Sequence, residues 1–248
     1  MSWQPTAHPE CEQMTVEDFE RAIRTARFVA GDGVLYRYGK PGVSRMVIQR
    51  VQARVLVDLC RAKDWCADLW PPETVAGDNC AWTHAGMVLD PSWTVEQTTP
   101  RCRMAHWTDI VSPGDRLLIV RPALVGTEDC GDRRRMLADS ARVALRDVEL
   151  RTPYPHTELI TYWLWSWGIR RTLLGTSFLD IFSREKGNVC SASVIEWWRM
   201  AGLLSDLTGC DARAEAWYPG RMGCDPALKP VAHIEIVQDT SAQTTREL

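Results

Sequence analysis

The stretch at residues 187–202 reads GNVCSASVIEWWRMAG and predicts a short connection followed at once by a helix. Apolar residues recur in it at the three- and four-residue spacing of a buried helical stripe, namely Val194, Trp197, Trp198 and Ala201. Gly202 is placed to end the helix as a C-cap residue. Cys190 therefore lies on or just before the first turn of the predicted helix.

A cysteine at a helix start has two interpretations. Unpaired backbone N–H groups and the positive end of the helix dipole stabilise a thiolate there, so Cys190 is a candidate nucleophile. A single cysteine in this position is more often a small buried packing residue. The nucleophile hypothesis for Cys190 therefore depends on a base supplied by another part of the chain.

Length and composition describe an ordinary globular protein. The chain has 248 residues, 45% of them hydrophobic, which is enough for one sizeable core. Its formal net charge is -3 and its basic residues are scattered along the chain. Because a nucleic-acid-binding surface needs clustered positive charge, no nucleic-acid partner is expected.

The N-terminal residues MSWQP have neither a charged region nor an apolar core, so no classical signal peptide is predicted. No apolar run approaches the length that spans a bilayer. The nine cysteines are odd in number and irregularly spaced, which favours reduced thiols and leaves one or two disulfides open. We expect a protein that is cytoplasmic or delivered without a classical signal peptide.

The pattern of apolar residues and turns predicts a mixture of helices and strands. Residues 1–30 are interpreted as a leader, loose up to residue 13, and a helix that begins at Thr15 and ends at residues 30–33. A polar tail at 239–248 is expected to be disordered. Strands are predicted at 34–38, 81–89, 93–98, 116–121 and, at a sheet edge, 233–237; helices at 128–148, 156–167 and 190–201; a helical or mixed segment at 43–69; and a loop at 203–230.

Among the five histidines, His84 alone lies on a predicted buried strand beside small residues. Residues 90–92, Asp-Pro-Ser, predict a hairpin turn after that strand. If three residues form the loop, Glu96 falls opposite Gly86 and diagonal to His84, with both polar groups on one face. Taken alone, His84 is also explained as a satisfied core histidine and Glu96 as an exposed strand carboxylate.

The order of these pieces resembles the circularly permuted branch of the NlpC-like papain-fold cysteine hydrolases. The resemblance runs from Gly31 to Gly202 and rests on an ordered set: Gly31-Asp32 before a strand, THAGMV at 83–88, TVE at 94–96, PGD at 113–115, an Arg-rich helix ending near Thr152-Pro153-Tyr154, and VCS at 189–191. In that branch the histidine strand precedes the cysteine helix.

The resemblance implies roles for five residues. Cys190 is the expected nucleophile, His84 the general base and Glu96 the third polar residue of a triad. The backbone N–H of Cys190 contributes to an oxyanion hole, and Tyr154 and Ser191 are further oxyanion or substrate residues.

It also implies an α+β, papain-like fold over residues 31–238, with a central antiparallel sheet packed against helices. Residues 43–79 exceed the expected distance between the first two strands, and we interpret them as an insertion.

The implied chemistry is hydrolysis of an amide or peptide bond through a thioester, with no cofactor. The substrates to expect are peptides or cell-wall peptide fragments. Some permuted relatives act on lipid acyl groups, so an acyl-lipid substrate, hydrolysed or used in acyl transfer, is the alternative.

Two other hypotheses stay open. Cys80 and His84 could join Cys60 and Cys66 in a metal site, although no paired Cys-x2-Cys elements occur. The other alternative is a catalytically inactive binding module on the same fold, because a fold does not determine a function.

Overall fold

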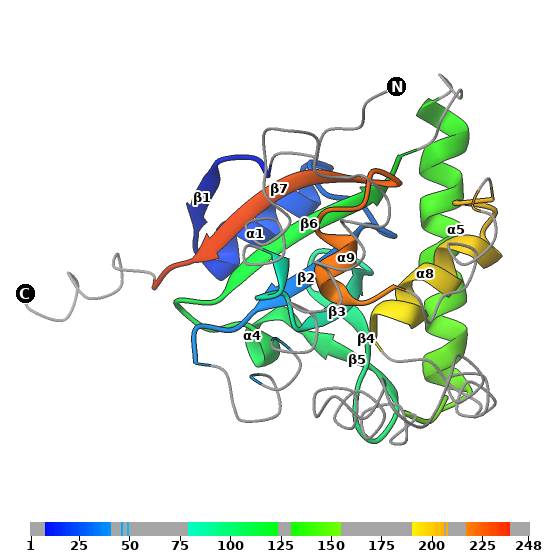
Figure 1. Ribbon diagram of the computed structural model, residues 1–248, viewed down its shortest axis with the longest axis horizontal. Coiled ribbons are helices and arrows are strands. Elements are labelled where there is room, and N and C mark those ends of the chain that lie inside the picture. Colours follow the sequence, from blue (N-terminus) through cyan, green and yellow to red (C-terminus); the bar gives the residue numbers. More distant parts are fainter. Residues whose placement is uncertain are drawn as a thin grey trace, which may run out of the picture.

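A computed structural model describes residues 8–40, 46, 49, 79–123, 130–154, 190–205, 207 and 217–238. Within these residues the protein is α+β, with a seven-stranded mixed sheet in the order β1-β7-β6-β2-β3-β4-β5 and helices packed against it (Figure 1). The elements are β1 (Cys11–Met14), α1 (Val16–Arg24), β2 (Gly33–Arg37), β3 (His84–Val88), β4 (Trp93–Gln97), β5 (Cys102–His106), α4 (Trp107–Ile110), β6 (Arg116–Pro122), α5 (Cys130–Glu149), α8 (Cys190–Met200), α9 (Pro219–Met222) and β7 (Leu228–Ile236).

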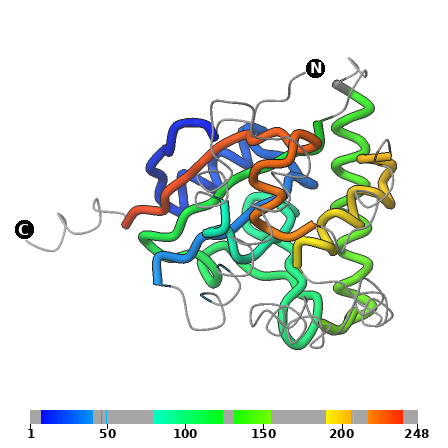
Figure 2. Tube along the Cα trace, viewed as in Figure 1, coloured from blue at the N-terminus to red at the C-terminus, as the bar shows by residue number. Residues whose placement is uncertain are grey.

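The sequence analysis predicts an antiparallel sheet, but the observed sheet contains one parallel pair of strands. Its first strand, β1, pairs parallel to β7 with Cys11 opposite His233, whereas every other pair of neighbouring strands is antiparallel. Figure 2 shows the first strand (blue) beside the last (red). Residues 11–14 therefore belong to the sheet, and the prediction that residues 11–13 form part of a loose leader is wrong.

The same pairing corrects the prediction for the last strand. β7 begins at Leu228, five residues before the predicted start at His233, and lies between β1 and β6 rather than at an edge. Its burial alternates residue by residue, as the sequence pattern indicated. The predicted loop at 203–230 also contains the short helix α9, which begins at Pro219.

The sheet carries a hydrophobic core on each face. Successive residues of β2 alternate between two clusters: Leu35 belongs to one, and Val34 and Tyr36 belong to the other. The Leu35 cluster includes buried residues of α5 and α8, and the Val34 cluster includes those of α1. In Figure 1, α5 and α8 pack against each other at one end of the molecule.

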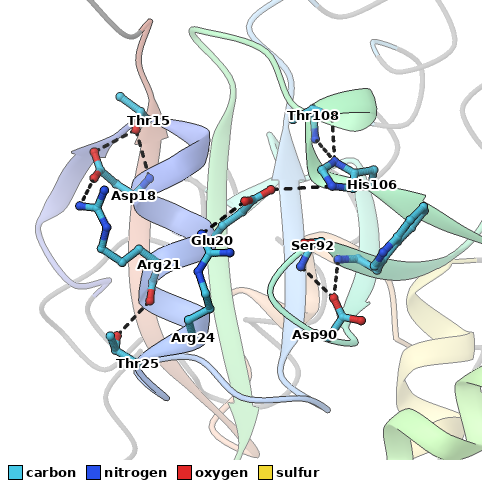
Figure 3. A network of polar contacts seen from close by, with 11 residues as sticks. Thr15, Asp18, Glu20, Arg21, Arg24, Thr25, Asp90, Ser92, His106 and Thr108 are labelled. Carbon is cyan, nitrogen blue, oxygen red and sulfur yellow. Dashed lines mark hydrogen bonds and ion pairs between the residues drawn. The ribbon is translucent and has the colours of Figure 1, made fainter. Parts of the chain in front are cut away.

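Helix α1 begins where the sequence predicts and ends earlier. The Thr15 hydroxyl accepts a hydrogen bond from the Asp18 backbone N–H, which satisfies a first-turn donor (Figure 3). The predicted end at residues 30–33 is wrong, because the helix stops at Arg24 and Ala26 takes a left-handed φ of 58°.

The β3–β4 hairpin has the register that a three-residue loop demands. Gly86 lies opposite Glu96, and the Leu89 N–H donates to the Trp93 carbonyl across the turn. Asp90 stabilises the turn, because its carboxylate accepts hydrogen bonds from the backbone N–H groups of Ser92 and Trp93 (Figure 3).

The other predicted elements have separate outcomes. Strand β6 is buried on both faces, as its continuous apolar run predicts. Helix α5 matches the predicted helix at 128–148 closely. The predictions of a helical or mixed segment at 43–69, an insertion at 43–79, a helix at 156–167 and a disordered tail at 239–248 fall almost entirely outside the described residues.

Candidate active site

The structure brings together the three residues on which the sequence analysis depends. Cys190 is the first residue of α8, His84 the first residue of β3, and Glu96 lies on β4. His84 Nε2 lies 2.7 Å from Glu96 Oε2, and Cys190 is close enough to raise the pKa of the His84 imidazole. Although more than a hundred positions of sequence separate the sulfur from the imidazole, the two side chains interact.

The two ring nitrogens of His84 are not equivalent. Because Nε2 faces the ionised Glu96 carboxylate, Nε2–H donates to that carboxylate, which leaves Nδ1 as the nitrogen able to accept a proton. A carboxylate bonded to one ring nitrogen sets both the tautomer and the orientation of an imidazole. His84 can therefore exchange a proton with Cys190 while Glu96 holds the ring in place.

The pKa of His84 reflects three competing influences. Burial acts to lower it, because burial disfavours the charged imidazolium. Charge and hydrogen-bond interactions with Cys190, together with the hydrogen bond to Glu96, outweigh burial, so the pKa of His84 is raised well above its ordinary value of 6.5. The imidazolium form of His84 is therefore favoured at neutral pH.

Glu96 is a buried carboxylate that keeps its charge. Its side chain is 3% exposed, and burial alone would raise its pKa. Hydrogen bonds and charge attraction from His84 and Arg103 overcome burial and lower the pKa of Glu96 from 4.5 to about 2. Glu96 is therefore ionised at neutral pH.

Arg103 is the site residue that the sequence analysis missed. It lies on β5, directly opposite Glu96, and donates from Nε and Nη2 to Glu96 Oε1 at 2.8 and 2.6 Å. No strand was predicted there, because the residues Cys-Arg-Met-Ala-His show no clean alternation of apolar and polar side chains. The one available signal was an arginine seven positions after the proposed carboxylate.

Tyr36 forms a wall beside His84. The two residues are cross-strand partners, and their ring centroids lie 5.3 Å apart. Tyr36 is buried, which raises its pKa well above 10, so its hydroxyl stays neutral beside Glu96 and Cys190. Gly86 makes room for this wall, because a Cβ there would lie 3.1 Å from both the Tyr36 hydroxyl and Thr94 Oγ1.

The Ser191 side chain forms a buried hydrogen bond with the backbone of another segment. Its hydroxyl is buried and donates to the Trp217 carbonyl at 2.8 Å, which ties the first turn of α8 to the segment before α9. Tyr154 is half-buried and packs against the hydrophobic cluster that contains Cys190. Its backbone N–H donates to the Pro100 carbonyl.

Helix α8 is held firmly at its far end as well. The Trp198 indole N–H donates to the Gly31 carbonyl, and the Trp197 indole N–H donates to Asp147 of α5, both at 2.7 Å. Gly202 has a φ of 85° and caps the helix: its N–H reaches the Arg199 carbonyl, and the next N–H reaches the Trp198 carbonyl. This is the Schellman arrangement that a C-terminal glycine predicts.

The other histidines among the described residues, His8, His106 and His233, take other positions. His106 ends β5 and caps α4, with its ring nitrogen accepting from the Thr108 N–H and its other nitrogen 4.0 Å from Glu20 (Figure 3). His233 on β7 forms ring contacts with His8 and Trp82. Burial lowers the pKa of His233 to about 4, so it is neutral at physiological pH.

The metal hypothesis gains no support from the described residues. Among them, no group of three or more His, Cys, Asp or Glu side chains could hold a metal ion. Cys60 and Cys66 of the proposed ligand set lie outside the described residues.

Cys11, Cys102 and Cys190 are free cysteines, and burial raises the pKa of Cys102 to about 12, which makes that thiol inert.

Comparison with family models, curated proteins and solved structures found no match to this chain. Within the described residues, no helix has both the length and the apolar character needed to cross a membrane.

Proposed function

We propose that this protein is a cysteine hydrolase that cleaves an amide or peptide bond through a thioester on Cys190. In this proposal His84 is the acid and base, and Glu96 orients it. The proposal rests above all on one observation: His84 is hydrogen-bonded to the Glu96 carboxylate and also interacts with the Cys190 side chain, which raises the pKa of His84. Nucleophilic catalysis by cysteine needs this combination of thiol, base and orienting group.

Two further features support a nucleophilic role for Cys190. The residue starts an eleven-residue helix, where backbone N–H groups and the helix dipole stabilise a thiolate and a developing oxyanion. Glu96 is buried yet remains ionised, at a cost that only its partners offset. A buried carboxylate with one oxygen on Arg103 and the other on the His84 imidazole is the arrangement that an orienting residue of a triad needs.

The proposed reaction has two halves. The Cys190 thiolate attacks the carbonyl carbon, and backbone N–H groups at the start of α8, including that of Cys190, stabilise the oxyanion. His84 then donates its proton to the leaving nitrogen, the C–N bond breaks and a thioester remains. Neutral His84 next takes a proton from water, hydroxide attacks the thioester, the C–S bond breaks and the acid leaves, which restores the thiolate and imidazolium.

The fold proposed to carry this chemistry is the papain-like, circularly permuted NlpC type. It is supported by an antiparallel succession β2–β3–β4 that delivers His84 and Glu96 before the cysteine helix in chain order. Helix α8 packs against β3, the strand of His84.

Selective alkylation tests the proposal without a known substrate. Iodoacetamide should react with Cys190 at least tenfold faster than with exposed Cys11, and His84→Ala should remove that preference. Cys11 is the control because it is exposed and its pKa is raised rather than lowered. Slow, unselective labelling would show an inactive binding module instead.

A substrate screen then distinguishes the two hydrolase readings. Peptides and cell-wall peptide fragments form one arm, and phospholipids form the other. Turnover should vanish in Cys190→Ala and in His84→Ala while circular dichroism shows an intact fold. Turnover of phospholipids alone would assign the acyl-lipid reaction in place of the amide reaction, and full activity in Cys190→Ala would end both.

A further inference from the structure

The strongest unassigned feature of the molecule is the arginine behind the proposed triad. Arg103 uses two donors, Nε and Nη2, on a single oxygen, Oε1 of Glu96. The second oxygen, Oε2, is left to accept from His84. We propose that Arg103 is a positioning residue that fixes the Glu96 carboxylate so that one oxygen stays on the His84 ring; this inference rests on the proposed function.

The position of Arg103 makes this role possible. It is the direct cross-strand partner of Glu96, so the two Cβ atoms are held close together by the sheet itself. Its side chain is 53% exposed, whereas that of Glu96 is 3% exposed. The guanidinium thus reaches from the surface of β5 onto a carboxylate that water scarcely touches.

The burial of Glu96 explains why the arginine matters for orientation. A buried charged oxygen without a partner is costly, whereas charge-assisted hydrogen bonds compensate its desolvation. Without Arg103, Oε1 would lose both of its donors at a site that is almost closed to solvent. Rotation of the carboxylate toward another donor, or entry of water, would relieve that cost and would draw Oε2 away from the imidazole.

Arginine suits this position better than lysine. A planar guanidinium offers two parallel donors in a fixed geometry, whereas an ammonium offers one point charge on a flexible stem. Arg103→Lys keeps the positive charge and loses the second directed donor. It therefore separates the orientation of the carboxylate from simple charge attraction.

The test compares the rate of Cys190 alkylation by iodoacetamide in Arg103→Met, Arg103→Lys, Glu96→Gln and the Arg103→Met/Glu96→Gln double variant. Arg103→Met should slow alkylation about tenfold, within the hundredfold that a misplacement of about 1 Å can cost. Arg103→Lys should fall between Arg103→Met and the wild type. In the Glu96→Gln background the Arg103→Met change should have no further effect, because the arginine acts through the carboxylate.

Arg101→Met is the matched control, because Arg101 is an exposed arginine that lies two positions before Arg103 and immediately precedes β5. Cys190 of the Arg101→Met variant should be alkylated at the wild-type rate. On any substrate that the screen identifies, Arg103→Met should lower kcat with little change in KM, whereas loss of substrate binding would raise KM.

Two results would overturn the inference. Wild-type reactivity of Cys190 in Arg103→Met would show that the arginine has no influence on the triad. An equal loss of rate in the Glu96→Gln background would assign Arg103 a structural role. If Cys190 of the wild type reacts no faster than Cys11, the proposed function and this inference fall together, and that outcome is distinct from both.

Discussion

Two buried carboxylates in this protein are each held by an arginine from a neighbouring part of the sheet, and they behave in opposite ways. Asp32 precedes β2 and is fully buried; Arg121 of β6 donates to both of its oxygens, at 2.6 and 2.7 Å. Glu96 is almost as buried, yet Arg103 occupies only one of its oxygens. In the first pair the arginine occupies both carboxylate oxygens, whereas in the second pair one oxygen accepts from His84 instead.

The electrostatic consequences differ in sign. Burial raises the pKa of Asp32 even though Arg121 and the Val29 N–H act to lower it. For Glu96 the balance is reversed, and the pKa falls to about 2. The additional partner is His84: its imidazolium stabilises the Glu96 carboxylate, and the carboxylate in turn orients the His84 ring and raises its pKa. A buried carboxylate thus points to chemistry when one of its oxygens faces a titratable group.

Asp32→Ala gives the largest expected effect on stability. It removes both oxygens that accept from Arg121 and should lower the free energy of unfolding by about 3 kcal/mol, as the loss of one partner of a buried pair typically does. Urea denaturation measures it. Asp32→Leu combined with Arg121→Met should recover much of the loss, and a double variant as unstable as the single one would contradict this account.

Of the two carboxylates, Glu96 gives the larger expected effect on reactivity when it is replaced, in Glu96→Gln. The amide keeps the shape of the carboxylate but loses the charge that stabilises the His84 imidazolium, so kcat/KM should fall about 10- to 100-fold. Asp32→Asn, assayed where it is still folded, should stay within about twofold of the wild type. Equal losses in the two variants would mean that the distinction between the pairs is false.

The two carboxylates should also change stability in opposite directions on acidification. The folded-state pKa of Glu96 lies below its ordinary 4.5, so its contribution is present above about pH 4.5 and is lost as the pH falls toward 2. The pKa of Asp32 is raised above 3.8, so its protonation favours the folded state as the pH falls. Between pH 5 and 2, Glu96→Gln should therefore lose stability less steeply than the wild type and Asp32→Asn more steeply.

Urea denaturation at a series of pH values tests this prediction. Asp115→Asn serves as a control, because Asp115 is a buried carboxylate held by the backbone N–H groups of Gly39 and Ser112 rather than by arginine. Parallel pH profiles for Glu96→Gln and Asp32→Asn would rule out the opposite signs.

The smallest expected effect is a shift in the pH dependence of the reaction. Because the pKa of His84 is raised well above 6.5, its imidazolium persists through neutral pH and the alkaline limb of kcat/KM should lie above that value. Glu96→Gln removes one cause of the raised pKa, so the limb should move to lower pH. An unmoved limb would show that His84 does not depend on Glu96; Asp32→Asn should leave it in place.

The sequence predicted those features that depend on residues close together in the chain, namely helix caps and a hairpin turn. The hydroxyl of Thr15 caps α1, Gly202 caps α8 and a three-residue turn sets the β3–β4 register, so each of these follows from residues close together in the chain. The approach of His84 to Glu96 could be predicted for the same reason, because both lie on one hairpin.

Other elements depend on distant partners and left little local trace. β1 has four residues with no fully buried side chain, and it becomes a strand because β7 pairs with it from the other end of the chain. β5 carries an irregular pattern of exposure at a sheet edge. Arg103 was missed with it, since its role is visible only once β5 lies beside β4.

The sequence by itself determined where Cys190 begins a helix and how His84 and Glu96 share a hairpin, because helix caps, turns and apolar spacing act over a few residues. Only the tertiary structure decided that sulfur, imidazole, carboxylate and the Arg103 guanidinium meet. Packing of α8 onto the sheet and pairing of β5 with β4 bring them together, and both are set by the burial of apolar surface across the whole chain rather than by any one stretch of it.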